Sequence, residues 1–367
     1  MFDRIGSAKP YFAYFGFGGY CVFLFLMLSG FCVYLGYRNK FDDISLKGAL
    51  SFFWKRLIKI YPSYFISNIF IIAVNLMYGL YYNRSLKFLL DYVLQNLKSY
   101  FSVLTMTQAW IPSLVISGNK ASWFVSCLFF CYLVSPFVIW FYNKLNKRVN
   151  VFILFALSCV LNYMVSSRLP VYMARLLKIP DNLIALFSYS FPIFRFFEFF
   201  SGMVLCDLFL KVRQWIDERV GASVFSVLEI SLMVIFLMHP TTASKNSLIF
   251  RSSIFLFMSI IFVLAFDKGI VSHFFSRKPF VHLSAITLFF YLFHFPIMEL
   301  PFFSRHLIMH IHVEQEKALP LIFGIYIVMY LVTLWLSFAY EAAVKKFEEK
   351  YPELNSRITN CFAEKNV

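Results

Sequence analysis

Three cations stand close together in the stretch SFFWKRLIKIYPSYF, residues 51–65. Arg56 and Lys59 are three residues apart and Lys55 and Lys59 are four apart, so on a helix all three share one flank. Such a cluster could bind the phosphates of an anionic ligand, because guanidinium and ammonium groups are natural partners of phosphate oxygens. It could equally fix the orientation of a membrane helix, since cytoplasmic loops are rich in Lys and Arg. The residues alone leave both interpretations open.

Three further ionisable residues, His294, Arg195 and Glu198, lie inside long apolar stretches. An ionisable group inside a membrane is costly and indicates a functional site by default. The spacing of Arg195 and Glu198 predicts an ion pair, either structural or at the wall of a cavity. For His294 the alternative to a functional role is a core histidine that donates one hydrogen bond to a neighbouring helix.

Other polar residues in apolar surroundings have simpler explanations. Glu229 is isolated and is expected to hydrogen-bond to a neighbouring helix, and Glu299 lies near water. Ser29 and Gly30 are expected to permit close helix packing. No metal site is predicted, because neither the Cys127–Cys131 pair nor the last histidines have a suitable ligand set. These histidines are His306, His310 and His312.

The elements that position these residues must be membrane helices. Of the 367 residues, 60% are hydrophobic and 14% are charged, and the mean hydropathy is +0.71. Soluble domains carry about 25% charge, so the chain is an integral membrane protein. The net charge is +15, and the basic residues lie between the apolar stretches. This placement fits contact with anionic lipids, and nucleic acid is not an expected partner.

A membrane-spanning helix needs about 20 apolar residues, and the fold class predicted is all-α, a polytopic helix bundle of about nine spans. Residues 1–345 form the predicted transmembrane domain and residues 346–367 a cytoplasmic tail. The segment 86–118 is mixed in character and is interpreted as interfacial or re-entrant. The predicted spans are 15–37, 61–82, 121–142, 150–166, 189–210, 221–238, 248–266, 282–300 and 319–339.

The distribution of Lys and Arg predicts the orientation. One set of alternate connections, together with the C-terminal tail, holds 20 Lys and Arg residues, and the opposite set holds 13. The richer set is expected in the cytoplasm, which places the N-terminus outside and the C-terminus inside. By this orientation His294 lies about six residues from the outer end of its span, roughly 9 Å deep. Arg195, Glu198, Trp123 and Ser126 fall near the same level, which predicts one polar layer in the outer half of the membrane.

Several blocks of sequence, in the same order, resemble the membrane-bound acyltransferase 3 family. The resemblance covers nearly the whole chain. The blocks are GYCVFLFLMLSGF (19–31), WKRLIKIYPSYF (54–65), LTMTQAWIPS (104–113), SWFVSCLFFCYLVSP (122–136), RFFEFFSGMVL (195–205) and ITLFFYLFHFPI (286–297).

The resemblance implies an enzyme that takes an acyl group, usually acetyl, from coenzyme A and transfers it to a hydroxyl of a sugar or another surface molecule. It implies that Lys55, Arg56 and Lys59 bind the phosphates of acyl-CoA, the co-substrate. The substrate-binding residues expected from the matching blocks are Trp123, Ser126 and Tyr291. The catalytic residues expected are His294, Glu198 and Arg195.

Two departures from the family pattern stand out. The family has one span more, and that first span carries an Arg and a His regarded as the catalytic base, whereas no His precedes His239 here. Either the true start lies upstream, or this member lacks the usual base. His294 is the stand-in, because a near-neutral pKa suits a proton acceptor. The second departure is milder: the family's Arg-x-x-Arg is Arg56-Leu-Ile-Lys59.

The predicted function is a membrane O-acyltransferase of the bacterial inner membrane. The acceptor expected is a cell-surface polysaccharide or a lipid-linked sugar, and the other partners are membrane lipids and acyl-CoA. The alternative is a non-catalytic remnant, or a transporter or flippase of a surface-glycan pathway. The sequence leaves the acceptor sugar and the oligomeric state undetermined.

Overall fold

The computed structural model describes residues 9–83, 91, 93–243, 247–300, 315–353 and 356. Over these residues the chain folds into helices and turns, with no strand. The elements in chain order are α1 (Lys9–Tyr37), η3 (Arg38–Phe41), α2 (Leu46–Asn83), α4 (Leu97–Leu104), η4 (Gln108–Trp110), α5 (Trp123–Asn146), α6 (Val151–Val165), α7 (Leu169–Leu176), α8 (Asp181–Ser190), α9 (Pro192–Arg219), α10 (Ala222–Ala243), α11 (Ser247–Leu264), α12 (Ile270–Phe275), α13 (Lys278–Met298) and α15 (Gln315–Lys350).

The chain divides into two compact units. The first consists of Met1–Ala49 and Phe130–Val281, and the second of Leu50–Phe129 and His282–Val367. The first unit therefore contains α1 and the helices from α6 to α12, and the second contains most of α2 and α13 together with α4 and α15.

The described helices confirm a polytopic membrane bundle. Six are long and apolar enough to cross a membrane, and the count is seven if α6 and α7, bent by 57° at a short break, form one broken span. The prediction of about nine is higher for two reasons. Helix α9 carries four charged residues within its first 20, namely Arg195, Glu198, Asp207 and Lys211. Helix α11 is counted only over Ser253–Leu264, the part of it whose side chains the structure describes. The six spans are Cys21–Phe41, Leu46–Met77, Trp123–Asn146, Ala222–His239, Lys278–Met298 and Phe323–Lys350.

Two local predictions concern the start of α2 and the segment 86–118. The connection predicted over residues 38–60 is largely helical, because α2 begins at Leu46 and continues through Pro62. The segment 86–118 contains, in its described part, the short elements α4 and η4, helical residues at 91 and 93–95, and no candidate span. That result agrees with an interfacial or re-entrant segment.

Helices α1 and α9 pack with their backbones in close contact. A Cβ added to Gly30 would lie 1.9 Å from the carbonyl oxygen of Phe199, and one added to Gly202 would lie 1.9 Å from that of Met27. Each glycine thus lets the backbone of the other helix approach where no side chain fits, as in small-residue helix contacts of membrane proteins. The structure confirms the packing role predicted for Gly30.

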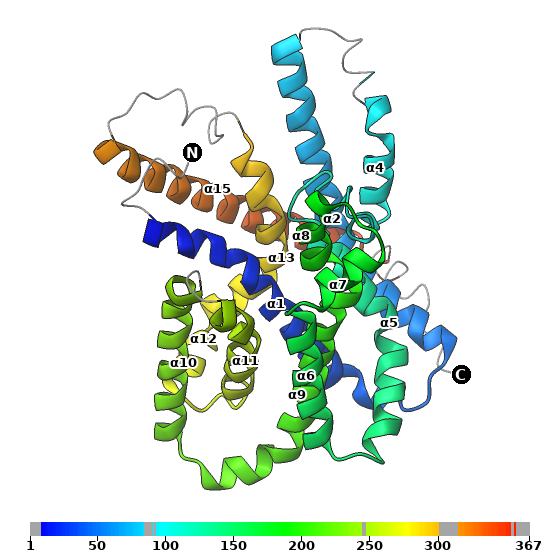
Figure 1. Cartoon of the computed structure of the whole chain (residues 1–367), viewed down its shortest axis with the longest axis vertical. Coiled ribbons are helices and arrows are strands. Elements are labelled where there is room, and N and C mark those ends of the chain that lie inside the picture. The colour runs from blue at the N-terminus through cyan, green and yellow to red at the C-terminus, as the bar shows by residue number, and fades with distance from the viewer. Residues whose placement is uncertain are drawn as a thin grey trace. The chain divides into compact units, whose positions relative to one another are not determined.

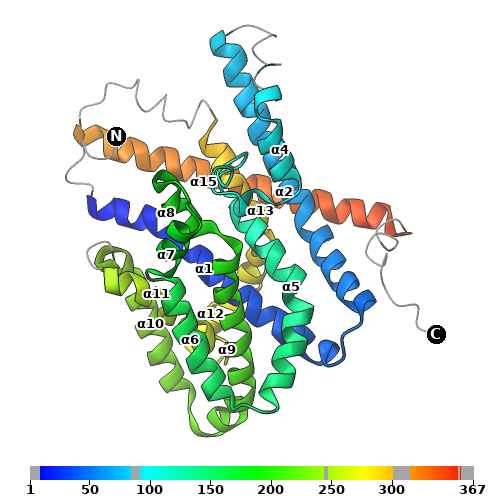
Figure 2. The same cartoon turned by 45° about the vertical axis from the view of Figure 1, so that its right-hand side comes forward.

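Helices α1 and α9 run in the same direction. Phe23 lies against Arg195 near the start of α9. Phe31, about two turns further along α1, packs on Phe209, about four turns further along α9, with ring centroids 5.7 Å apart. Helix α6 lies along the other side of α9, as both Figure 1 and Figure 2 show. There the buried Asn162 side chain donates to the carbonyl of Phe197 at 3.1 Å and contacts the Ser201 hydroxyl.

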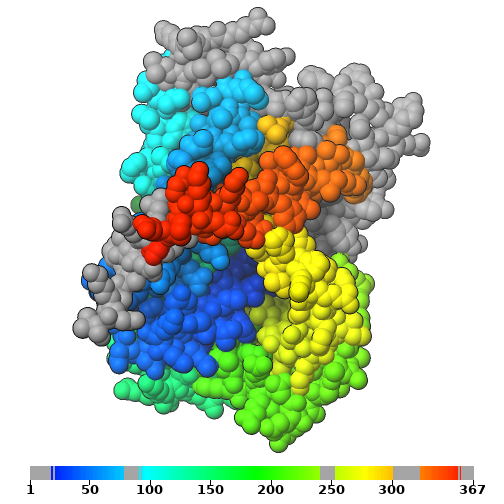
Figure 3. Space-filling model, turned by 180° about the vertical axis from the view of Figure 1, so that it is seen from behind, coloured from blue at the N-terminus to red at the C-terminus, as the bar shows by residue number. Residues whose placement is uncertain are grey.

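Helices α10, α11 and α12 complete the first unit, and the part over residues 222–281 forms the yellow-green to yellow surface of Figure 3. Glu229 of α10 is fully buried, and its carboxylate accepts hydrogen bonds from the backbone N–H groups of Gly269, Val271 and Ser272 and from the Ser272 hydroxyl, at 2.6–3.2 Å. A carboxylate at a helix N-terminus satisfies its unpaired donors. Glu229 therefore hydrogen-bonds to a neighbouring element, as predicted.

The loop between α9 and α10 is also fixed by charge. The Lys268 ammonium contacts the Asp217 carboxylate at 2.9 Å and donates to the carbonyls of Asp217 and Val220. This hydrogen-bonded cation holds the pKa of the exposed Asp217 carboxyl below its ordinary value. Lys268 thus ties the end of α9 to the turn that follows α11.

The second unit is organised by buried amides. The Asn119 side chain donates to the carbonyl of Leu292 in α13 at 2.6 Å, while its backbone N–H donates to Asn68 of α2 at 3.0 Å. The Gln108 amide donates to the Tyr64 hydroxyl of α2 at 2.9 Å and to Ser122 at the start of α5. These bonds join α2, the turns after α4, α5 and α13 into one packed group.

Substitution of Gly202 tests the α1–α9 contact. Gly202→Ala is expected to lower the free energy of unfolding by about 1–3 kcal/mol or more, the cost of overpacking, because the new methyl meets backbone. The measurement is thermal unfolding of the detergent-solubilised protein. Gly36→Ala on α1 is the control, since nothing lies within 4 Å of its added Cβ. Equal stability of the two variants would contradict the packing.

Candidate active site

Arg195 and Glu198 form a buried ion pair one turn into α9. The guanidinium Nη1 lies 3.0 Å from the carboxylate Oε1, and the two side chains are 4% and 0% exposed. Although the two atoms are close, their geometry does not meet the angles of a hydrogen bond. Neither carboxylate oxygen of Glu198 has a hydrogen-bond partner among the described residues, and neither do Nε and Nη1 of Arg195. The structure confirms the predicted pair and places it inside the protein.

Such a pair does not stabilise the fold well. Burying two charges costs several kcal/mol per ion, and the mutual attraction repays this only when the remaining hydrogen bonds are made. Among the described residues, Nε and Nη1 of Arg195 and both carboxylate oxygens of Glu198 lack such hydrogen bonds. A costly, under-satisfied charge inside a membrane protein indicates a functional site.

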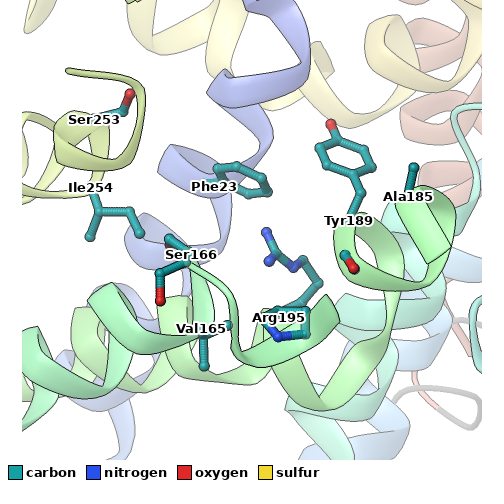
Figure 4. Close-up of a pocket in the computed structure, with 11 residues that line it drawn as sticks. Phe23, Val165, Ser166, Ala185, Tyr189, Arg195, Ser253 and Ile254 are labelled. Carbon is teal, nitrogen blue, oxygen red and sulfur yellow. The ribbon is translucent and has the colours of Figure 1, made fainter. Parts of the chain in front are cut away.

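Arg195 lies at the wall of a cavity of about 180 Å³ in the first unit. Figure 4 shows the guanidinium pointing toward the Phe23 ring of α1, and its Cζ lies 4.3 Å from the ring centroid. This contact combines charge with the electron-rich ring face. Glu198 pairs with Arg195 but does not line the cavity. The cavity is lined by Phe23, Val165, Ser166, Ser167, Pro170, Ala185, Ser188, Tyr189, Arg195, Ser253 and Ile254.

The local sequence explains how the wall forms. Pro192 starts α9 at its first position, which suits a residue without a backbone N–H, so Arg195 falls in the first turn. The Tyr189 hydroxyl donates to the carbonyl of Gly19 at 2.6 Å and fixes α8 against α1. At the other end of the cavity in Figure 4 stands Ser253 of α11, whose hydroxyl lies 2.5 Å from Nε2 of the buried His239. A cavity with one buried cation and a mainly apolar wall can hold a small polar group next to that charge.

His294 lies on α13 in the second unit and is partly buried. Its Nδ1 contacts the carbonyl of Tyr291, one turn earlier. Only a protonated Nδ1 can donate to a carbonyl, which leaves the lone pair of the neutral ring on Nε2. Because His294 and Arg195 belong to different units, the polar layer that would unite them stays a prediction.

Trp123 and Ser126 lie in the first turn of α5, and Tyr291 of α13 contacts the residues just before it, all in the second unit. The Tyr291 hydroxyl donates to the carbonyl of Ala121 at 3.0 Å, and its ring packs edge-on against Phe124. Trp123 is 7% exposed, and the fully buried Ser126 hydroxyl donates to the carbonyl of Met106 at 2.5 Å. The structure thus brings these predicted residues into one region, where Ser126 makes a structural hydrogen bond. Their contact with a substrate stays a prediction.

Lys55, Arg56 and Lys59 lie on α2. Because this segment is helical, the three cations share one flank of the helix, as their spacing predicts. Lys55 and Lys59 are exposed, and Arg56 is partly buried, with its guanidinium Cζ 5.5 Å from the centroid of the Phe52 ring. The structure leaves phosphate binding by this cluster a prediction.

Two sets of buried polar residues are not among the predicted site residues. The buried amides Asn119 and Gln108 join the helices of the second unit, and both stand in stretches too mixed to give a periodic signal. Asp207, 5% exposed, is a buried carboxylate four residues before Lys211, a spacing that favours an ion pair on a helix.

A metal site has no support in the part of the chain that the structure describes, where no three His, Cys, Asp or Glu side chains gather. His306, His310 and His312 lie outside the described residues.

The helices define a multi-pass membrane protein with a buried cation at a small cavity. The family comparison gives the class of this protein: the profile of the acyltransferase domain matches residues 1–341, more than nine-tenths of the chain. The chain belongs to the acyltransferase 3 family. No curated protein and no solved structure matches it. Membership supports membrane acyltransferase activity in general.

A pair of variants separates a functional Arg195 from a structural one. Arg195→Gln alone strands the buried Glu198 carboxylate and is expected to destabilise the protein by about 3–5 kcal/mol. Arg195→Gln combined with Glu198→Gln leaves two neutral amides and is expected to restore the wild-type melting temperature. Acyl transfer by this folded double variant is expected to stay about 100-fold or more below wild type, the usual effect of removing an oxyanion-stabilising group. Full activity in the double variant would make the pair structural.

Proposed function

We propose that the protein is an O-acyltransferase that moves an acetyl group from acetyl-CoA to a hydroxyl of a cell-surface polysaccharide or lipid-linked sugar. The observation that carries the proposal is the buried Arg195 guanidinium at a cavity wall in a chain of the acyltransferase 3 family. The enzyme is placed in the bacterial inner membrane, with acetyl-CoA arriving from the cytoplasmic side. The excess of Lys and Arg in one set of connections supports that orientation.

The reaction requires a positive group near the thioester carbonyl. When the acceptor oxygen attacks, negative charge develops on the carbonyl oxygen, and a fixed guanidinium in a water-poor site stabilises it strongly. Arg195 suits this role because its side chain is 4% exposed and is held between Glu198 and the Phe23 ring. Its orientation is therefore set before the substrate arrives.

The reaction also requires a proton acceptor. The acceptor hydroxyl loses its proton as its oxygen bonds to the acyl carbon, the C–S bond breaks, and the thiolate of coenzyme A takes up a proton. His294 is proposed for the acceptor role, because a lone pair on Nε2 suits a general base. The roles of Arg195 and His294 are proposed independently, one in each unit.

Binding of the two substrates is assigned to residues of the second unit. Lys55, Arg56 and Lys59 are proposed to contact the phosphates of acetyl-CoA, as point charges in the case of the two lysines. Trp123, Ser126 and Tyr291 are proposed to line the path of the acceptor. Of these three, Tyr291 is the one whose ring is partly exposed, and a sugar ring can pack on its flat apolar face.

The first test uses the O-acetyl content of surface glycan. Cells that lack the gene are complemented with the chain as given, with His294→Ala, or with His282→Ala as a control on the same helix. His282 is half exposed and pairs with Glu341 at the surface, so its loss is expected to cost little. We expect acetylation to be restored by the wild type and the control and to be lost with His294→Ala. No restoration by a stably inserted wild-type chain would favour a non-catalytic or transport role.

A second test addresses the donor. Arg56→Ala combined with Lys59→Ala removes two charges and is expected to raise the KM for acetyl-CoA by about 10-fold, since a charge-assisted hydrogen bond contributes about 1.5–3 kcal/mol. Lys47→Ala, an exposed cation at the start of the same helix, is the control. Unchanged donor kinetics in the double variant would remove α2 from the donor site.

A further inference from the structure

A second cavity of about 320 Å³ lies in the first unit, where α1, α5 and α9 end near one another. Three segments that are far apart in the sequence meet there, and they border one another as blue, teal and green surface in Figure 3. The cavity contains three cations and one carboxylate. Its lining residues are Tyr34, Arg38, Asn39, Asp42, Asn143, Asn146, Lys147 and Lys211.

The buried Asp207 organises one wall. Its carboxylate Oδ2 accepts hydrogen bonds from the Tyr142 hydroxyl at 2.9 Å and from the Asn146 amide at 2.8 Å. The Lys211 ammonium lies 3.3 Å from the same oxygen and donates to Asn146 Oδ1 at 2.7 Å. Lys211 and Asn146 are thus held in fixed positions at the cavity, and Lys211 keeps a third N–H for another acceptor.

Asn143 organises the opposite wall. Its amide nitrogen donates to the carbonyl of Arg38 at 2.8 Å and to the Asp42 carboxylate at 2.7 Å, and its oxygen accepts from the Tyr34 hydroxyl at 3.1 Å. These bonds fix the short helix η3 against α5. The backbone of Arg38 is therefore held at the rim of the cavity.

Two of the three cations have no carboxylate partner. Within the described residues no ion pair or side-chain hydrogen bond involves the Arg38 guanidinium or the Lys147 ammonium, whereas the charge of Lys211 is largely balanced by Asp207. Counting Asp42 and Asp207 against the three cations leaves the site net positive. An excess of Lys and Arg on one membrane side explains cations in these segments, but it does not require them to meet around one cavity with fixed walls.

We propose that this cavity binds a phosphate group, held by the Arg38 fork and by the ammonium groups of Lys147 and Lys211. Guanidinium and ammonium groups with fixed N–H donors are the usual ligands of phosphate oxygens. The phosphate belongs either to coenzyme A or to the headgroup of an anionic lipid. The first source rests on the proposed function, in which acetyl-CoA is the acyl donor.

The test compares two double variants with equal charge change. Arg38→Gln combined with Lys147→Gln removes both unpaired cations of the cavity. Lys40→Gln combined with Lys144→Gln is the matched control, because these two cations come from the same two segments. They rest on the rings of Tyr37 and Trp140, at 5.0 and 4.0 Å, and do not line the cavity.

Binding is measured on the full chain in phosphatidylcholine nanodiscs by titration with adenosine 3′,5′-bisphosphate, the phosphorylated nucleoside fragment of coenzyme A. In parallel, phosphatidylglycerol retained from mixed discs is quantified by mass spectrometry. We expect the cavity variant to raise the Kd for the bisphosphate by about 10-fold or more, which corresponds to the loss of one charge-assisted contact. The control is expected to stay close to wild type.

The outcomes separate the two sources and the proposed function. An unchanged Kd for the bisphosphate with loss of retained phosphatidylglycerol in the cavity variant alone would assign the site to a lipid headgroup. Equal behaviour of the cavity and control variants with both probes, or no binding of either probe by wild type, would overturn the proposal. Because these are binding measurements, a failure of acetyl transfer by wild type would contradict the proposed function and leave the phosphate site standing.

Discussion

The close contact of α1 with α9 is the constraint on which the first unit depends. Gly30 and Gly202 let the two backbones meet, each at the point where a Cβ would lie 1.9 Å from a carbonyl oxygen. Because the helices run in the same direction, this contact fixes both of their ends. Near its start, α9 holds Arg195 against the Phe23 ring, and toward its end it places Asp207 and Lys211 beside the end of α5.

Three carboxylates are buried in the described helices, and each has different partners. Glu229 accepts four hydrogen bonds from the turn at the start of α12, so its charge is fully used in holding the fold. Asp207 accepts two hydrogen bonds and pairs with Lys211, and it thereby positions the polar groups of a cavity. Glu198 pairs with Arg195, and neither of its carboxylate oxygens has a hydrogen-bond partner within the described chain. Of the three carboxylates, Glu198 is the one whose burial is not compensated by hydrogen bonds, so a structural role alone does not explain its pair with Arg195.

Local features of the sequence predicted much of this arrangement. Long apolar stretches predicted the helices, the i, i+3 spacing predicted the Arg195–Glu198 pair, and the small residues Ser29 and Gly30 predicted a close helix contact. The matching glycine, Gly202, was not predicted as its partner, because a partner 172 positions away has no local signal. The same holds for Asn119, whose amide bonds to α2 and α13 at sequence separations of 51 and 173. The predicted span 61–82 begins well after the start of α2 at Leu46, because the cations before it interrupt the apolar pattern, although Lys and Arg are good helix formers.

The most direct test of the account is the release of coenzyme A thiol by the purified chain in proteoliposomes, with acetyl-CoA outside and an acceptor glycan added in turn to each side. The account predicts acceptor-dependent thiol release when the glycan and acetyl-CoA lie on opposite sides of the membrane. It also predicts that Arg195→Gln combined with Glu198→Gln abolishes this release in a folded protein. Thiol release that needs no acceptor, or that persists in this variant, would contradict the claim that the buried Arg195 serves acyl transfer.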